Sequence, residues 1–497
     1  MQVNGTDPAA ELNRPLGRSR DVNAHPTHSE PSEPEAPQPQ ARRHHLRLVL
    51  RGWGLVAVAL ATVAAPFVVL LSGPKPAGRE FLWDFSMGLG FGGMALIAMQ
   101  FLLTGRIKWL THPFGADIVT RFHRHLSLSA VLLVLAHFAI LYVWFEPDLG
   151  ALNPLDARWE LTAGRLALFC FVALIVTSEL RKRLRLRYEV WRHLHLGLAV
   201  VGFAAAVAHV LAAGQFTADP GKRALWLGVT LGWAVLLVRT RLLRPLGQLR
   251  NPWRVVRNTP RHGGVHTLEL APEGAGLRNW RPGQFVWLSI GRSPFSLREH
   301  PFTISTAPEK GPNLEFSIKP LGDDSAGLAK VEPGARAYVD GPYGAFSIDR
   351  VPDAPGFVMI AGGVGITPIV ANLHALEARG DDRPVILLYA NGAWDDAAFR
   401  DELERMRGQI RLTLVHVLET PPDGWTGLGV LESPPAGWTG ETGRIDRTIL
   451  ARHLPPETEA WPHFLCGPAP MTEAVTQALR DKGVRRGDII FEVFELA

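Results

Sequence analysis

The sequence predicts a multidomain protein in which a six-helix transmembrane bundle precedes an antiparallel β-barrel and an α/β domain built on a parallel sheet. Three observations lead to this prediction. Long apolar segments fill the first half, short alternating strands fill residues 246–352, and apolar strands alternate with helices over residues 353–497. The chain has 497 residues, which is too long for one ordinary domain. Of these residues 47% are hydrophobic, and this high share points to membrane spans.

Residues 1–45 are rich in Pro, Glu, Ser, Gln and His, and they are predicted to be disordered. The membrane domain is predicted to cover residues 46–245. Its first helix is Gly52–Ser72, an uncharged run that is too long and starts too late for a cleaved signal peptide. Five further helices are predicted near residues 84–104, 126–145, 161–179, 194–213 and 223–239.

The loops between these helices alternate in charge. Basic residues gather at 106–124, 181–192 and 239–244, whereas the loop at 146–160 is acidic and is interpreted as an ordinary solvated loop. The positive-inside rule then predicts a multi-pass protein of the plasma or inner membrane with both termini in the cytoplasm. Because the basic residues lie beside apolar runs, the net charge of +5 is no sign of nucleic-acid binding.

Two of the predicted membrane helices carry histidines at the same spacing. His123 and His137 are 14 residues apart, and so are His195 and His209. At 100° per residue this spacing ends about 40° short of four full turns, so each pair shares one helix face with about 21 Å between its members. Both helices are predicted to run outward, which places His123 and His195 at an inner level and the other two at an outer level.

Facing imidazoles at each level predict two bis-histidine haem b sites. Arg121 and Arg124 lie at the inner level and are candidate partners for haem propionates. His125 and His193 lie off the shared faces and are interpreted as interfacial side chains. A proton relay or a metal transporter with a regulatory nucleotide-binding domain is the competing interpretation, because ionisable groups in membranes are usually functional.

The barrel carries a pattern suited to a flavin. In HPFTISTAP (300–308), His300 suits the pyrophosphate, Phe302 suits the flat isoalloxazine and Thr303 suits the flavin N5 atom. Further phosphate contacts are expected from Lys319 and from backbone amides near Ser325 and Gly327.

Two glycine-containing segments of the α/β domain suit a dinucleotide. IAGGVGITPI (360–369) follows an apolar strand and opens a helix, so that its backbone can approach a pyrophosphate. FLCGPAPM (464–471) ends a later strand of the same sheet, where Cys466 is placed near the nicotinamide. The only other cysteine, Cys170, lies in an apolar run and is interpreted as a packing residue, so no disulfide framework is indicated.

In this order, HPFTISTAPE, GPYG, GGVGITP and CGPAPM resemble the ferredoxin-NADP reductase superfamily. The HPFT version, together with the paired histidines, is similar to ferric reductases and NADPH oxidases, and the resemblance covers residues 46–497. It implies that electrons pass from NADH or NADPH to FAD, then through an inner and an outer haem, to an acceptor beyond the membrane. It also divides the soluble half into an FAD domain, 246–352, and an NAD(P) domain, 353–497.

The residue patterns and the resemblance together give the candidate sites. The iron ligands are the four histidines above, and the candidate catalytic residues are Thr303, Cys466 and Phe494. Two features depart from the oxidases. The oxidases end in an aromatic residue near the flavin, whereas here three residues follow Phe494, the candidate stacking lid. In the oxidases the two histidines of the second pair are also commonly one residue closer together in sequence. The cofactor-binding residues are His300, Pro301, Phe302, Thr303, Lys319, Ser325, Gly327, Gly341, Tyr343, Gly344, Gly362, Gly363, Gly365, Thr367, Cys466, Gly467 and Pro468.

The nucleotide and the acceptor are predicted less directly. Asp395 and Asp396 follow the strand VILLYA, and no arginine occurs before Arg400, which favours NADH because aspartates repel the extra phosphate of NADPH. Ferric chelates are the expected acceptor. The alternatives are oxygen, reduced to superoxide as in NADPH oxidases, and a partner redox protein served by this chain as an electron-donor subunit. The oligomeric state is not predicted.

Overall fold

The computed structural model describes residues 81–107 and 115–492, apart from 152, 154–155, 215, 297 and 421–439, together with scattered positions between 50 and 72. Within these residues, five helices are long and apolar enough to cross a membrane. They are α2 (Phe81–Thr104), α4 (Gly115–Trp144), α6 (Trp159–Glu179), α7 (Tyr188–Ala213) and a last helix formed by α8 (Pro220–Val238), the π-helical turn Arg239–Leu243 and α9 (Arg244–Arg250).

Five of the six predicted spans therefore correspond to helices. The last one was predicted to end at residue 239, but its π-helical turn continues the helix to Arg250. The predicted first span, Gly52–Ser72, is described only at scattered positions, which include a short apolar helix, Val56–Ala65. Of its described positions, Val63 is helical and packs against the apolar core of the other helices.

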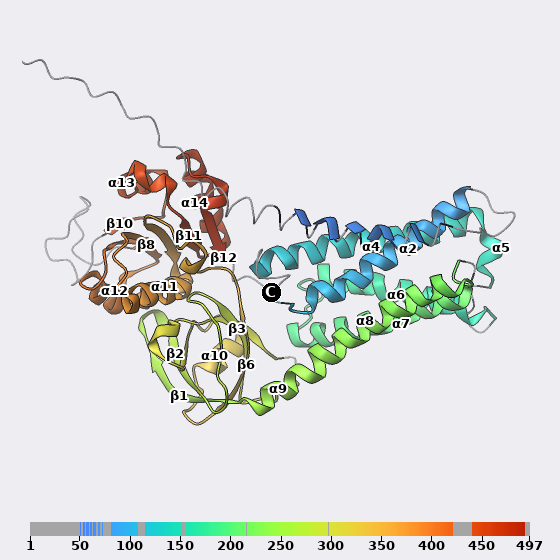
Figure 1. The fold of residues 1–497 in the computed structure, drawn as a ribbon, viewed down its shortest axis with the longest axis horizontal. Helices are drawn as coiled ribbons and strands as arrows, with labels where there is room; N and C mark the ends of the chain where they lie inside the picture. The colour runs from blue at the N-terminus through green and yellow to red at the C-terminus, as the bar shows by residue number, and fades with distance from the viewer. Residues whose placement is uncertain are drawn as a thin grey trace, which may run out of the picture. The chain divides into compact units, whose positions relative to one another are not determined.

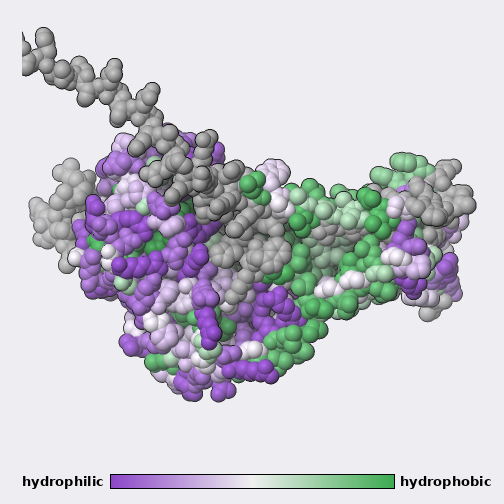
Figure 2. Space-filling model, in the orientation of Figure 1, coloured by the Kyte–Doolittle hydropathy of each residue, from purple (hydrophilic) through white to green (hydrophobic). Residues whose placement is uncertain are grey.

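Small residues allow the membrane helices to lie close together. A Cβ atom on Gly93 of α2 would lie 2.6 Å from a methyl group of Val134 on α4, and one on Gly202 of α7 would lie 2.8 Å from Cys170 on α6. Such close approach is typical of helix packing in membranes. Figure 1 shows these helices running side by side, and Figure 2 shows hydrophobic side chains covering their visible face.

The domain after α9 contains a six-stranded antiparallel sheet with strand order β4-β3-β6-β1-β2-β5. Inward-facing residues such as Val255, Leu268 and Phe316 are fully buried in its core. This sheet occupies the region predicted to form a barrel. Its strands are β1 (Trp253–Pro260), β2 (His266–Pro272), β3 (Phe285–Ile290), β4 (His300–Thr303), β5 (Leu314–Ile318) and β6 (Arg336–Tyr343), with the short helix α10 (Asp323–Leu328) after β5.

The last domain contains a six-stranded parallel sheet with strand order β10-β9-β8-β7-β11-β12. The helices α11 (Ile366–Arg379) and α12 (Arg400–Arg407) pack on one core, and α13 (Arg447–His453) and α14 (Ala469–Asp481) pack on another. The order of connection reverses between β7 and β11, which is where open α/β sheets bind ligands. The strands are β7 (Phe357–Gly362), β8 (Val385–Asn391), β9 (Leu412–Leu418), β10 (Gly440–Thr442), β11 (His463–Cys466) and β12 (Ile489–Glu492).

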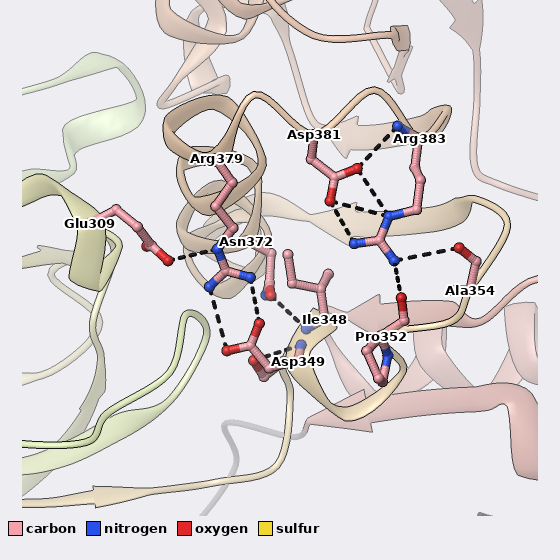
Figure 3. Close-up of polar contacts among 10 residues, drawn as sticks. Glu309, Ile348, Asp349, Pro352, Ala354, Asn372, Arg379, Asp381 and Arg383 are labelled. Atoms are coloured by element: carbon pink, nitrogen blue, oxygen red, sulfur yellow. Dashed lines mark hydrogen bonds and ion pairs between the residues drawn. The ribbon is translucent and has the colours of Figure 1, made fainter.

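Polar contacts hold the connection between the two sheets (Figure 3). The buried Asn372 on α11 accepts a hydrogen bond from the backbone N–H of Ile348 at 2.9 Å. Arg379, at the end of the same helix, pairs with Asp349 and with Glu309, both at 2.6 Å. The segment that leaves the antiparallel sheet is thereby fixed on α11, the helix that opens the predicted dinucleotide site.

Candidate functional site

The two outer histidines face one cavity and have the same hydrogen-bond arrangement. Nδ1 of His137 lies 2.9 Å from the backbone oxygen of Ser86, and Nδ1 of His209 lies 2.8 Å from the backbone oxygen of Glu160. A carbonyl oxygen only accepts, so each Nδ1 carries the proton and each Nε2 keeps a lone pair for a metal. The cavity of about 180 Å³ between α2, α4, α6 and α7 is lined largely by apolar side chains, among them Phe91.

The two inner histidines also face each other. The ring centres of His123 and His195 are 6.5 Å apart. Metal–nitrogen bonds of about 2 Å, with about 1 Å more to each ring centre, would separate two axial imidazoles by about 6 Å. Nδ1 of His195 lies 3.3 Å from the hydroxyl of Ser178, which donates its own proton to the backbone oxygen of Leu174. This arrangement again leaves Nε2 of His195 as the ligand atom.

Each level offers two imidazoles as candidate ligands. Among the residues that the structure describes, no group of three or more His, Cys, Asp or Glu side chains is arranged to hold a metal ion. A bis-histidine haem needs only two protein ligands, since the porphyrin nitrogens supply the other four. As predicted for interfacial residues, His125 and His193 are exposed, and their Nδ1 atoms bond backbone oxygens one turn earlier.

The cations at the inner level differ from those predicted. Arg124 pairs with Glu179 at 2.6 Å and is 63% exposed, and Arg121 is exposed as well. The arginines that line the inner cavity, which has a volume of about 320 Å³, are Arg106, Arg192, Arg241 and Arg244. Sequence spacing missed them because they come from three separate segments that meet only in the folded chain.

The predicted flavin strand lies at the edge of the antiparallel sheet. Phe302 is half-buried, and its ring centre lies 6.5 Å from that of His300, while Pro301 pairs with Trp287 on β3. Thr303 is 5% exposed, and among the described residues its hydroxyl has no hydrogen-bond partner. An orphaned hydroxyl at this position fits the predicted contact with the flavin N5 atom.

The GPYG segment lies at the end of β6, which is separated from this strand by β3. Gly344 has a φ of 92°, and a Cβ atom there would lie 3.0 Å from the ring of Phe285 on β3. Gly341 is equally confined, because its Cβ would lie 2.5 Å from Val286. The hydroxyl of Tyr343 donates to Asp340 at 3.0 Å, which ties the end of β6 together.

The predicted phosphate contacts gather around the start of α10. Lys319 is half-buried just after β5, and Gly327 is exposed within α10. The hydroxyl of Ser325 accepts from the backbone N–H groups of Leu321 and Gly322 at 2.9 and 3.0 Å. The side chain of Ser325 therefore organises the turn, and only its backbone amide remains a candidate phosphate donor.

The two dinucleotide motifs meet at the point where the parallel sheet reverses its order. A Cβ atom on Gly365 would lie 2.3 Å from the backbone oxygen of Cys466, and one on Gly362 would lie 3.0 Å from Pro468. A Cβ on Gly467 would lie 3.1 Å from the backbone nitrogen of Gly362. These glycines allow two backbone segments to pack without side chains between them.

The residues around these glycines suit the same site. Gly363 has a φ of 53°, the left-handed conformation that favours glycine. The hydroxyl of Thr367, which is 3% exposed, donates to the backbone oxygen of Val364 at 3.1 Å and fixes the first turn of α11. All seven predicted nucleotide residues therefore lie at the carboxyl ends of β7 and β11.

Cys466 is fully buried at this point. Burial, and the nearby Glu492 on β12, raise the pKa of the Cys466 thiol well above its usual value. A Cβ on Gly344 would lie 3.1 Å from Oε1 of Glu492, so this carboxylate lies between the GPYG segment and Cys466. Sequence reasoning missed Glu492, although it is the one charged residue of the final strand IIFE. Phe494 lies outside the described residues.

The first arginine after β8 is Arg400, and its positive charge is already paired. Arg400 pairs with Asp395 at 2.9 Å and donates to the backbone oxygen of Trp394 at 3.1 Å. The second aspartate, Asp396, accepts a hydrogen bond from the backbone N–H of Ala393. The cation nearest this loop in sequence is already neutralised by a neighbouring carboxylate.

Three family models match successive parts of the chain. Residues 89–207 match the ferric reductase like transmembrane component, residues 267–347 match the FAD-binding domain, and residues 359–477 match the oxidoreductase NAD-binding domain. The three matches fall on the helices, the antiparallel sheet and the parallel sheet respectively.

Individual relatives match only part of the chain. A flavohemoprotein of Bordetella pertussis is 27% identical over 328 residues, which are 61% of this chain and 78% of the relative. The NADH-cytochrome b5 reductase 1 of Debaryomyces hansenii is 34% identical over 204 residues, 38% of this chain and 65% of the relative. The solved ferredoxin reductase in carbazole 1,9a-dioxygenase is 25% identical, covers 49% of this chain and 69% of its own, and aligns with a TM-score of 0.40.

Proposed function

We propose that this chain carries electrons from cytoplasmic NAD(P)H across a membrane to an acceptor on the far side. It has the domain architecture of the ferric reductase and NADPH oxidase superfamily. The chain is a ferric-reductase-like membrane domain fused to FAD- and NAD-binding domains. Bound FAD would convert the two-electron donor into single electrons, and two bound haems would pass these on. The chain's own residues position these groups and exclude water.

The observation that supports the proposal most is the pairing of four histidines at two levels of one helix bundle. His123 and His195 face each other at the inner level, and His137 and His209 line one cavity at the outer level. Each pair takes one residue from α4 and one from α7. Two stacked metal sites on the same two helices form a path through the membrane, and a single transport site would need no such repetition.

The soluble half supplies the electron source in this proposal. The hydroxyl of Thr303 on β4 has no partner among the described residues and would face the flavin, and the buried Cys466 on β11 would lie near the nicotinamide. The carboxylate of Glu492 lies between these two motifs. By analogy with the NADH-cytochrome b5 reductase of Debaryomyces hansenii, and because Arg400 is neutralised, NADH is the proposed donor.

A ferric chelate is the proposed acceptor. With His137 and His209 both holding an iron, no position would be left for oxygen to bind it, so the outer site would favour electron transfer to a complex that docks nearby. Asp148 and Arg165 line the outer cavity, and Arg165 donates to the backbone oxygens of Leu149 and Ala151 at 2.7 Å.

Sealed vesicles with a known orientation test this function. NADH is added on the side of the nucleotide domain, and a membrane-impermeant ferric chelate is enclosed on the other side. We expect ferrous iron to appear inside while NADH is consumed outside, and the variant His209→Ala to abolish it. If iron were reduced only when the chelate is on the same side as NADH, transmembrane transfer would be contradicted. Superoxide as the main product would favour the oxidase alternative, and activity only with an added redox protein would favour the donor-subunit alternative.

A further inference from the structure

Arg106, in the loop that follows α2, makes an unusually complete set of contacts with the flavin sheet. Its two terminal nitrogens bond the two carboxylate oxygens of Glu299 at 3.1 and 2.5 Å, and one of them also bonds Asp340 at 2.9 Å. The guanidinium carbon lies 4.0 Å from the ring centre of Trp287. One side chain from the membrane domain therefore makes a bidentate ion pair, a second ion pair and a cation–π contact.

These three contacts fall on, or directly before, three neighbouring strands. The sheet order is β4-β3-β6, and Trp287 in the central strand pairs with Pro301 on β4 and with Asp340 on β6. Glu299 directly precedes β4, and Asp340 lies on β6. Arg106 thus spans the part of the sheet that carries both the HPFT and the GPYG motifs.

Two further arginines of the membrane domain join the same carboxylates. Arg192 on α7 bonds Glu299 at 2.9 Å, and Arg244 on α9 lies 3.3 Å from Asp340. Arg244 also donates to the backbone oxygen of Arg106 at 3.3 Å. We call Arg106, Arg192, Arg244, Glu299 and Asp340 the arginine clasp. All its cations come from the membrane domain and both its carboxylates come from the flavin domain.

The arginine clasp connects the two predicted redox centres through very short stretches of chain. Arg192 lies three residues before His195, the predicted inner iron ligand, and Glu299 directly precedes His300 of the flavin motif. The cavity beside the inner histidines is lined by all five clasp residues. A shift of the clasp would therefore move the flavin strand relative to the inner haem level.

The clasp is buried enough to define a geometry. Its side chains are between 9% and 20% exposed. Burial opposes both charges, yet Glu299 and Asp340 hold the pKa of Arg106 above its usual range, and Arg106 and Arg192 hold the pKa of Glu299 below its usual range. Breaking such a pair leaves an uncompensated buried charge, whereas an exposed pair has little effect on the structure.

We infer that Arg106 is a positioning residue that fixes strands β4, β3 and β6 against the membrane domain, and thereby sets the rate of electron transfer from the flavin to the inner haem. This inference rests on the proposed function. The step moves one electron at a time from reduced flavin to a ferric iron. One NADH therefore accounts for two transfers, and the proton of the reduced flavin is released to solvent.

The test uses the full-length protein with FAD and haem bound, mixed with NADH in the absence of oxygen. Flavin bleaching reports the first step, and the absorbance of ferrous haem reports the second. In Arg106→Ala we expect flavin reduction at the wild-type rate, and haem reduction slowed about 10- to 100-fold, because small misplacements of a donor have effects of this size. Arg106→Lys keeps the charge but loses the bidentate fork, so it should lie between the two.

Arg254→Ala is the matched control. Arg254 pairs with Glu273 at 2.6 Å within the flavin domain, and it is 53% exposed. This variant loses an arginine–carboxylate pair of the same sheet without touching the membrane domain, so both rates should match the wild type. Glu299→Gln removes the same ion pair from the opposite side and should reproduce the slow haem reduction if Arg106→Ala fails to fold.

Wild-type haem reduction in Arg106→Ala and Glu299→Gln, with normal FAD and haem contents, would overturn the inference. Hydrogen–deuterium exchange supplies a readout that is independent of electron transfer. Backbone amides of β4 and β6 should exchange faster in Arg106→Ala than in Arg254→Ala, and equal exchange would also overturn it. If NADH reduces the flavin of the wild type but never its haems, the proposed function fails, and the exchange data still decide whether Arg106 positions the strands.

Discussion

Nδ1 of His209 on α7 lies 2.8 Å from the backbone carbonyl oxygen of Glu160, in the first turn of α6. This bond fixes both the tautomer and the orientation of the imidazole, which points Nε2 into the outer cavity. Helix α6 also brings Gly164 against the His209 ring, since a Cβ atom on Gly164 would lie 2.9 Å from Nδ1 of that ring. The outer ligand is thus held by a backbone acceptor on one side and by a glycine on another.

Replacing this glycine tests the outer haem site without removing a ligand. In Gly164→Ala we expect the added methyl group to displace the His209 ring, because it would lie 2.9 to 3.1 Å from three atoms of that ring. The protein should keep its inner haem and lose the outer one, so that haem per FAD falls from two toward one in a pyridine haemochrome assay.

Gly228→Ala on α8 is the control for this prediction, since a Cβ there meets nothing within 4 Å. It makes the same substitution in another membrane helix and should retain both haems. Two haems in Gly164→Ala, or one in Gly228→Ala, would show that the glycine does not support the ligand.

Acid stability should depend on Glu402. Its carboxylate accepts from Nε2 of His374 at 2.6 Å and from Arg261 at 3.0 Å, which joins α12 and α11 to the flavin domain. Burial would raise the pKa of Glu402, but His374 and Arg261 lower it to about 2. A lowered pKa in the folded state gives stability that is present above the unfolded value, about 4.3, and is lost as the pH falls toward 2.

We therefore expect Glu402→Gln to lower the free energy of unfolding by about 1 to 3 kcal/mol at neutral pH. The difference from the wild type should shrink below pH about 4 and vanish near pH 2, as the wild-type carboxylate becomes protonated. Thermal release of FAD, followed by its fluorescence at several pH values, measures this. A constant difference at all pH values would contradict the assigned cause.

Helix periodicity predicted the histidine pairs because it depends only on local geometry. Residues 14 apart share a helix face wherever the helix lies, and the two faces then met in the bundle as expected. The strand and glycine motifs were predictable for the same reason, since β7 and β11 each carry their motif at their own carboxyl end.

The charged contacts could not be predicted in this way. Arg124 looked suited to a propionate from its position in sequence, but it pairs with Glu179 on another helix, 55 residues away. Arg106 and Glu299 are 193 residues apart, and each lies in a loop that gives no periodic signal. Such pairs depend on how distant segments meet in the folded chain, which single-sequence patterns do not encode.

The preference for NADH should depend on Asp395. Because its carboxylate pairs with Arg400, the extra phosphate of NADPH would meet Asp395 and Asp396 without a free cation. We expect kcat/KM for flavin reduction to be at least about tenfold higher with NADH than with NADPH. Asp395→Asn should narrow this ratio, because it removes one negative charge of the loop and one of the two carboxylates that pair with Arg400, the other being Asp401. A wild-type preference for NADPH would contradict the assignment.

Cys466 should affect hydride transfer to the flavin and nothing after it. Burial and the nearby Glu492 raise the pKa of its thiol, so it stays protonated at neutral pH and acts by shape and hydrogen bonding rather than as a nucleophile. We expect Cys466→Ala to slow flavin reduction by NADH about tenfold, with haem reduction by dithionite unchanged. Cys170→Ala, which removes the buried thiol of α6, is the matched control and should keep the wild-type flavin rate. Equal slowing in the two variants would mean that loss of a buried thiol, and not its place beside the glycines of β7, causes the effect.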